Sequence, residues 1–266
     1  MPNYLQRLAE ITAERGRLCV GLDPHPPLLE AWGLSVDVNG AERLARETIA
    51  ATGDLVAVYK PQAAFFECFG AAGYAALERV LADIKAAGAL SILDVKRGDI
   101  GSTMSAYARA FFGPDAPLAA DAITLSPFLG FESLRPALDL ANANESGVYV
   151  LCRTSNPQGG EVQLAQSWQR SVAQRIVDAA VAEAEQAGSA YVGLVIGATL
   201  AELDVDLSHF DGSILAPGVG AQGGTIGGLT RLFGESSWQV LASVSRQVLA
   251  AGPDPEALRS AVSEIS

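Results

Sequence analysis

Short apolar runs alternate with longer amphipathic segments along the whole chain. The apolar runs have the length and composition of buried strands. They lie at Leu18–Leu22, Leu55–Tyr59, Leu90–Val95, Ala122–Leu125, Gly147–Cys152, Tyr191–Ile196, Ser213–Ala216 and Gln239–Val244. Helical spacing of apolar residues is found between them, at Val38–Thr52, Tyr74–Ala87, Leu134–Asn142, Leu164–Ala187 and Leu229–Phe233. This alternation indicates an α/β fold with a parallel sheet.

The number of predicted strands suggests how the sheet closes. Eight strand–helix units in about 250 residues match the size of a closed (β/α)8 barrel, or TIM barrel. An open, doubly wound sheet is the alternative, but it usually has fewer strands in one domain. No linker, repeat or low-complexity tract divides the sequence, so residues 1–266 are predicted to form one barrel domain. An extra N-terminal helix, Tyr4–Glu14, is predicted to cover the bottom of the barrel.

Polar residues follow most of the predicted strands, at the end of a barrel where active sites gather. They are Asp23, Lys60, Asp94, Lys96, the segment Arg153 to Ser155, the segment Gly218 to Gly224, and Arg246. Because side chains alternate across a strand, Asp94 and Lys96 should share one face. A structural ion-pair cluster is the alternative. However, the chain has only three lysines, and two of them, Lys60 and Lys96, close apolar strands, which favours a catalytic array.

A second carboxylate follows the same strand after a turn. Gly98 permits the turn, and Ser102 is predicted to cap a helix that begins near Thr103. Asp99 and Thr103 are four residues apart, so both can face the same way at the helix start. The sequence therefore predicts a carboxylate, an ammonium and a carboxylate on one rigid rim.

The sequence Ala216-Pro217-Gly218-Val219-Gly220-Ala221-Gln222-Gly223-Gly224 is a glycine-rich loop between a strand and a helix. Glycines let backbone N–H groups converge on an anion, and a helix N-terminus adds positive charge. Arg246, after the last strand, could bind the same phosphate through two hydrogen bonds. The Gly-x-Gly-x-x-Gly spacing is weak as a dinucleotide signature because it lies late in the chain. An ordinary turn is the structural alternative.

Charge and cysteine content exclude several other classes of protein. The net charge of −12 argues against nucleic acid or an anionic membrane as a partner. No apolar run approaches the ~18 residues that span a bilayer, and Met1 to Arg17 is not a signal peptide. Three cysteines without CxxC spacing fit reduced, buried thiols, so a soluble cytoplasmic protein is expected.

Two further features bear on chemistry. The two histidines, His25 and His209, are isolated, which disfavours a Ser-His-Asp hydrolase and predicts surface positions. No zinc or EF-hand spacing is present. The segment Arg153 to Gly160 is polar and contains glycine, a composition typical of a mobile lid or of a solvated loop.

Taken together, the motifs resemble the orotidine 5′-phosphate decarboxylase family, in particular its longer-chain bacterial branch. The resemblance runs nearly from end to end. It rests on Val20-Gly21-Leu22-Asp23-Pro24, Tyr59-Lys60-Pro61-Gln62, Asp94-Val95-Lys96-Arg97-Gly98-Asp99-Ile100, Arg153-Thr154-Ser155-Asn156-Pro157, Pro217 to Gly224, and Ser245-Arg246. It implies a carboxy-lyase that converts orotidine 5′-phosphate to uridine 5′-phosphate in de novo pyrimidine biosynthesis, without a metal or organic cofactor.

The resemblance also implies a role for each matching residue. Lys96 would protonate C6 of the pyrimidine, Asp94 would lie beside the substrate carboxylate, and Asp99 would complete the array from the partner subunit of a homodimer with shared active sites. Lys60 would join this array. The implied substrate contacts are Asp23 and Lys60 with the ribose hydroxyls, Thr103 with the neighbour's ribose, Ser155 with the pyrimidine edge, Gln222 with pyrimidine and phosphate, and Arg246, Pro217, Gly218 and Gly223 with the phosphate.

Two other functions remain open from the residues. One is a Mg²⁺-dependent sugar-phosphate decarboxylase or aldolase of a related barrel type, which carries a shorter Asp-x-Lys-x-x-Asp motif. That chemistry needs an acidic metal ligand at the end of the second strand, where this chain has Lys60. The other is a non-catalytic protein that binds a phosphate ligand on the same fold.

Overall fold

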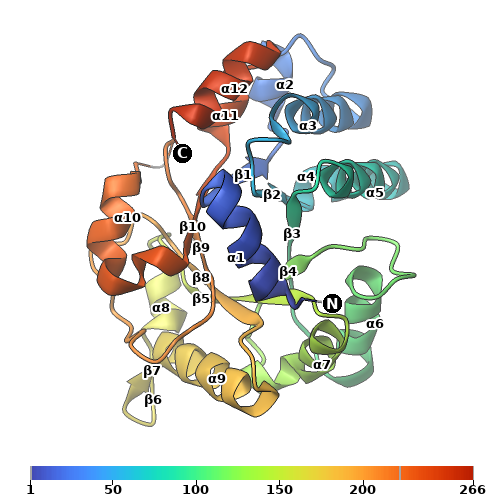
Figure 1. Cartoon of the computed structure of the whole chain (residues 1–266). Helices are drawn as coiled ribbons and strands as arrows, with labels where there is room; N and C mark the ends of the chain where they lie inside the picture. Colours follow the sequence, from blue (N-terminus) through green and yellow to red (C-terminus); the bar gives the residue numbers. More distant parts are fainter. Residues whose placement is uncertain (1, 222, 266) are drawn as a thin grey trace.

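Within the residues that the computed structural model describes, 2–221 and 223–265, eight parallel strands close into a barrel surrounded by helices (Figure 1). Around the barrel the strands are β1 (Leu18–Leu22), β2 (Val58–Pro61), β3 (Leu90–Arg97), β4 (Ala122–Leu125), β5 (Gly147–Arg153), β8 (Val192–Ile196), β9 (Ile214–Pro217) and β10 (Val240–Val244). Because β1 pairs with both β2 and β10, the sheet has no free edge. The predicted (β/α)8 barrel is confirmed.

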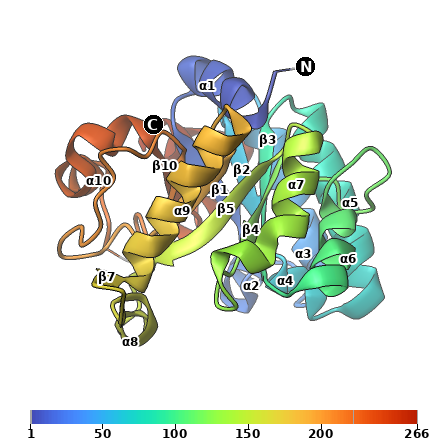
Figure 2. The same cartoon turned by 90° about the horizontal axis from the view of Figure 1, so that it is seen from below.

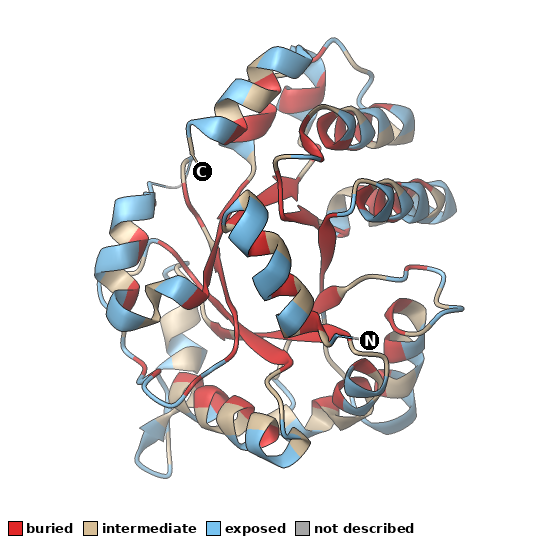
Figure 3. Ribbon diagram, in the orientation of Figure 1, coloured by how far each residue is buried: buried red, intermediate tan, exposed pale blue. Residues whose placement is uncertain are grey.

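The helices form an outer ring around the strands. They are α2 (Pro26–Ala31), α3 (Val38–Thr52), α4 (Ala64–Glu67), α5 (Gly70–Ala86), α6 (Gly101–Phe111), α7 (Arg135–Ala143), α8 (Gly159–Gln163), α9 (Val172–Ala187), α10 (Ile226–Phe233), α11 (Arg246–Leu249) and α12 (Pro255–Ser263), with 3-10 turns η1 (Phe131–Leu134) and η2 (Gly234–Gln239). Figure 3 shows buried strands inside and helices whose outer faces are exposed. No helix of the described ranges is long and apolar enough to cross a membrane.

The extra helix α1 (Tyr4–Arg15) closes the end of the barrel at which the strands begin. Tyr4 and Leu8 pack on Cys19 and Tyr149 inside the barrel, and the hydroxyls of Tyr4 and Tyr149 lie 3.0 Å apart. Asn3 caps the helix in a reciprocal pair with Gln6. In Figure 2, α1 and α8 lie at opposite ends of the molecule. The strand-end side chains therefore face the mouth of the barrel, the end opposite α1.

Apart from shifts of a few residues in the bounds of strands and helices, three local predictions were wrong. The helix predicted over Leu164–Ala187 begins at Val172, because Ser171 caps it by accepting a hydrogen bond from the N–H of Gln174. The preceding residues form a hairpin of β6 (Gln166–Ser167) and β7 (Arg170–Ser171). Its turn is tight, since Trp168 and Gln169 have φ values of 53° and 66°.

The other two wrong predictions concern a helix cap and a thiol. The helix α6 begins at Gly101 and not near Thr103, and Ile100 occupies the cap position without a side-chain hydrogen bond. Ser102 does not cap it, because it already lies in the first turn of the helix, and Asp99 accepts the N–H of Ile100 at 2.8 Å just before the helix. Cys19 and Cys152 are buried as predicted, but Cys68 is exposed after α4.

Candidate active site

Four charged side chains meet at the ends of β1, β2 and β3. Lys60 Nζ lies 3.1 Å from Asp94 Oδ2 and 3.8 Å from Asp23 Oδ1. Lys96 Nζ lies 2.5 Å from Asp94 Oδ1. The side chains of Lys60 and Asp94 are almost fully buried, whereas that of Lys96 is 44% exposed. The structure therefore brings together these four predicted residues, with Lys96 alone reaching well into solvent.

The surrounding charges keep Asp94 and Lys60 ionised. Burial on its own would raise the pKa of Asp94, but the ammonium groups of Lys60 and Lys96 and the hydroxyl of Thr124 lower this pKa to about 2. Burial on its own would likewise lower the pKa of Lys60, but Asp23 and Asp94 raise it above its usual value. Asp94 and Lys60 thus carry fixed opposite charges at neutral pH.

The backbone at Lys96 departs from regular strand geometry. Pairing between β3 and β4 shifts between Leu93 and Arg97, so extra residues of β3 bulge out opposite β4. Within the bulge Lys96 has φ of 45°, a left-handed conformation that costs on the order of 1–3 kcal/mol for a residue other than glycine. Bulges of this kind often re-aim a side chain beside an active site.

Thr124 of β4 contacts the two charged residues of this bulge and was not predicted. Its Oγ1 donates to Asp94 Oδ1 at 2.8 Å and accepts the backbone N–H of Lys96 at 2.9 Å. The only sequence signal for it is a single hydroxyl in an otherwise apolar strand.

Asp99 and Thr103 lie beyond the bulge, at the start of α6. Thr103 is exposed and Asp99 is half-buried. Among the described residues Asp99 forms no ion pair with Lys96, and its carboxylate accepts the N–H of Ile100. Arg97 points away from the site, where it pairs with Glu67 and stacks 5.6 Å above the ring of Tyr107. Asp99 and Thr103 therefore do not join the charge cluster of their own chain.

The glycine-rich loop follows β9 and leads into α10. Gly218, Gly220 and Gly223 have φ values of 108°, 78° and 94°, which favour glycine. The N–H groups of Gly220 and Gly223 are bonded within the loop, to Gly224 and Gly220. Thr225 caps α10 through the N–H of Gly228. These contacts give a tight turn at a helix N-terminus. The predicted residue Gln222 lies outside the described residues.

The remaining predicted residues surround the same mouth. Arg246 is exposed at the first position of α11, directly after β10. Ser155 follows β5 and packs against Gly197, where an added Cβ would lie 2.9 Å from the Ser155 Oγ. The Arg153 guanidinium donates a hydrogen bond to Asp204 at 2.9 Å. Arg153 is therefore engaged with the loop, and Ser155 is the residue of this segment that is available to a ligand.

Buried polar atoms at the mouth lack hydrogen-bond partners within the described structure. They are Asp23 Oδ1, Gln62 Oε1 and Ser245 Oγ, which follow the neighbouring strands β1, β2 and β10. Buried polar groups are usually hydrogen-bonded, so this arc suits a ligand rich in hydroxyl groups. Gln62 and Ser245 stood within quoted motifs, but no pattern distinguished them as site residues.

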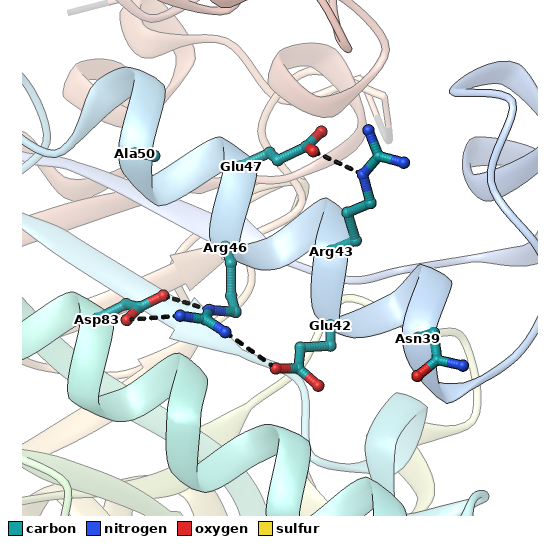
Figure 4. A pocket seen from close by; sticks show the side chains of 7 residues that line it. All are labelled: Asn39, Glu42, Arg43, Arg46, Glu47, Ala50 and Asp83. Atoms are coloured by element: carbon teal, nitrogen blue, oxygen red, sulfur yellow. Dashed lines mark hydrogen bonds and ion pairs between the residues drawn. The ribbon is translucent and has the colours of Figure 1, made fainter.

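A hollow on the outside of the barrel has a different character (Figure 4). It lies over α3 and α5, and its lining is Asn39, Glu42, Arg43, Arg46, Glu47, Ala50 and Asp83. Its charges pair with one another, as in Arg46–Asp83 and Arg43–Glu47, both at 2.6 Å. None of its residues comes from a strand end. In the described part of the chain, no group of three His, Cys, Asp or Glu side chains is arranged to hold a metal ion.

Comparison with known proteins gives one answer along the whole chain. The sequence model of the Orotidine 5′-phosphate decarboxylase / HUMPS family matches residues 16–261. An orotidine 5′-phosphate decarboxylase of Salinispora arenicola is 51% identical over 269 residues, 100% of this chain and 96% of that protein. One of Streptomyces coelicolor is 51% identical over 265 residues, 98% and 95% of the two chains. A crystal structure from Streptomyces avermitilis, assigned to the same enzyme, has a TM-score of 0.95 and 49% identity over 100% of this chain and 94% of that chain.

Proposed function

The chain belongs to the orotidine 5′-phosphate decarboxylase / HUMPS family and decarboxylates orotidine 5′-phosphate in pyrimidine biosynthesis, and we propose that Lys96 supplies the proton that replaces the carboxyl group at C6. The observation that carries this proposal is the contact of 2.5 Å between Lys96 Nζ and Asp94 Oδ1, beside the buried Lys60. An ammonium held by a buried carboxylate can serve both as a counter-charge and as an acid.

The reaction needs such a group because its intermediate has no electron sink. When the bond between C6 and the carboxyl carbon breaks, carbon dioxide leaves and the electron pair stays on C6. The ammonium of Lys96 stabilises this charge and then transfers a proton to C6, and the neutral amine regains a proton from water. A charge pair at 4 Å is worth ~4 kcal/mol at an effective dielectric of 20, whereas enzymes lower barriers by ~8–23 kcal/mol.

The remaining stabilisation is assigned to binding of the distant parts of the substrate. The Asp23 oxygen that lacks a hydrogen bond and the ammonium of Lys60 suit the ribose hydroxyls. Ser155 would bind the pyrimidine edge. Arg246 and the glycine-rich loop at Pro217, Gly218 and Gly223 would bind the phosphate, together with Gln222. Because the phosphate is bound far from C6, we favour a site that closes on the phosphate and excludes water before carbon dioxide is lost.

A two-fold dimer with shared sites is the assembly we favour. The turn that carries Asp99 packs on Ser126, whose N–H donates to the carbonyl of Arg97 at 2.7 Å. Next to it lie exposed apolar side chains, with Phe128 75% and Ile100 61% exposed. Exposed large apolar residues gathered on one surface typically mark an interface. Dimerisation through this face would bring Asp99 and Thr103 to the neighbour's site.

A metal-dependent reaction fits these residues less well. The ammonium of Lys60 lies within 4 Å of both Asp23 and Asp94, so it takes the place between the carboxylates that a Mg²⁺ ion would need. We also propose that residues 1–266 act as one catalytic barrel, and that the enzyme works in the cytoplasm.

The experiment that tests this function is an assay of orotidine 5′-phosphate decarboxylation after dialysis against EDTA. The proposal predicts full release of carbon dioxide and formation of uridine 5′-phosphate. Activity that returns only with added Mg²⁺ would favour the metal-dependent enzyme. Binding of the nucleotide without turnover would favour the non-catalytic protein.

A further inference from the structure

We propose that Thr124 is a positioning residue for decarboxylation, whose single hydroxyl fixes the carboxylate of Asp94 and the backbone of Lys96 relative to each other. This inference rests on the proposed role of Lys96. Thr124 does not touch the substrate in this account, and it acts through the two residues that it binds.

The geometry gives Thr124 an unusual double contact. Its side chain is buried, with 1% of its surface exposed, on the inner face of β4. The hydroxyl donates its one proton to Asp94 Oδ1 at 2.8 Å, the same oxygen that Lys96 Nζ contacts at 2.5 Å. A lone pair of the hydroxyl accepts the N–H of Lys96 at 2.9 Å. The donor and one acceptor position of the hydroxyl are therefore both used within the catalytic array.

The backbone of Lys96 explains why this contact is needed. With φ of 45°, Lys96 adopts a conformation that persists only where the surroundings determine it. The bulge between β3 and β4 removes the regular strand pairing at this point, since the register passes from Leu93 to Arg97. The Thr124 hydroxyl replaces the missing partner of the Lys96 N–H. It thereby sets the direction in which the lysine side chain leaves the strand.

Asp94 depends on the same hydroxyl for its orientation. One carboxylate oxygen contacts Lys60 and the other receives both Lys96 and Thr124. Without the threonine hydroxyl, rotation of the carboxylate would be restrained only by two flexible lysine side chains. Removing the hydroxyl should therefore loosen the catalytic pair and leave the ribose and phosphate contacts in place.

The test compares two pairs of variants that differ in the hydroxyl. Thr124→Val keeps the branched shape and loses the hydroxyl, and Thr124→Ser against Thr124→Ala makes the same comparison without the methyl group. We expect Thr124→Val to lower kcat by about 10- to 100-fold, the range for loss of a hydrogen bond to a charged group. KM and the Kd for uridine 5′-phosphate should change by less than about 3-fold, because Thr124 orients Asp94 and Lys96 and does not contact the groups that bind the ribose and the phosphate. Thr124→Ser should retain kcat within about 3-fold of the wild type.

A matched control separates this role from general stability. Thr48 is fully buried in α3 and bonds only to the carbonyl of Leu44, at 2.8 Å, so Thr48→Val loses a buried hydroxyl away from the site. Its kcat should be unchanged. If Thr124→Val does not fold, the comparison of Thr124→Ser with Thr124→Ala decides the question.

The outcomes distinguish this inference from the function on which it rests. The inference is overturned if kcat is unchanged in Thr124→Val and Thr124→Ala, or if kcat and nucleotide binding fall together in both. It is also overturned if Thr124→Ser is as impaired as Thr124→Ala. A wild-type protein that does not decarboxylate orotidine 5′-phosphate would instead refute the proposed function itself.

Discussion

Lys60 Nζ and Asp94 Oδ2 lie 3.1 Å apart across the neighbouring strands β2 and β3, and both side chains are withdrawn from solvent. A buried charge that loses its partner is costly, because water cannot replace the lost contact. This pair therefore links the stability of the barrel to the catalytic array.

Asp94→Asn should destabilise the protein at pH 7 by about 3 kcal/mol, the lower end of the range for breaking a buried pair, because Asp23 still faces Lys60. The control is Asp83→Asn, which breaks an exposed pair with Arg46 on the outer helices and should cost less than about 1 kcal/mol. The free energy of unfolding in urea measures both. Equal effects of the two substitutions would contradict the account.

The same pair gives a pH dependence with a definite sign. The pKa of Asp94 falls from its usual 3.8 to about 2 on folding, so its contribution to stability is present above about pH 4 and is lost as the pH falls toward 2. The stability difference between wild type and Asp94→Asn should therefore shrink over that window. A difference that stays constant from pH 5 to pH 2.5 would mean that the pKa of Asp94 does not change on folding, which would contradict the lowered pKa.

Removal of the phosphate contact should affect turnover as well as binding. Arg246→Ala is expected to raise KM and, if phosphate binding closes the site, to lower kcat too. Phosphite dianion should partly restore the rate of the wild type on a substrate that lacks the phosphate group. Arg43→Ala, an exposed arginine on α3, is the control and should change neither constant. A truncated substrate that reacts equally fast with and without phosphite would refute closure.

The three cysteines should differ sharply in reactivity. Burial raises the pKa of Cys19 and of Cys152 to about 12, whereas Cys68 is exposed. A thiol reagent should therefore label one cysteine per chain in the native protein and all three after unfolding. Rapid native labelling of Cys68→Ser would contradict this, because the remaining thiols lie in the barrel interior and beneath α9.

Much of the fold could be predicted because strands and helices leave a periodic signal. The predicted bounds of β1 and β4 coincide with the observed ones. β2 was predicted at Leu55–Tyr59 but runs over Val58–Pro61, since an inward-facing Lys60 breaks the apolar pattern that marked the strand. The hairpin at Trp168 was missed because its flanking residues continue the helical spacing of α9.

The part of the candidate site that could be predicted consists of charged residues that lie close together in the sequence. Asp94 and Lys96 do point to the same place, but they reach it through a bulge and a left-handed lysine and not through simple alternation. The contacts of Thr124, Gln62 and Ser245 depend on the register between neighbouring strands. A single sequence does not reveal that register, so it cannot show which hydroxyl or amide group reaches the site.

Shared active sites can be tested by mixing two inactive chains. Asp99 forms no ion pair with Lys96 of its own chain within the described ranges, so it should act on the neighbour. Mixing Lys96→Ala with Asp99→Ala should restore activity, because each mixed dimer contains one site with both residues intact. Random exchange makes half the dimers mixed and roughly a quarter of all sites intact. If native mass spectrometry shows exchange and activity does not recover, Asp99 serves its own subunit.

The most direct test of the account is the turnover of Lys96→Ala on orotidine 5′-phosphate, measured beside its affinity for uridine 5′-phosphate. The control is Lys85→Ala, which changes an exposed lysine in the last turn of α5 and should leave turnover unchanged. Lys96→Ala should lose at least the ~10²–10⁴-fold that a general acid contributes, and it should still bind uridine 5′-phosphate through the ribose and phosphate contacts. Retention of more than about a hundredth of the wild-type turnover would contradict the assignment of Lys96 as the proton donor.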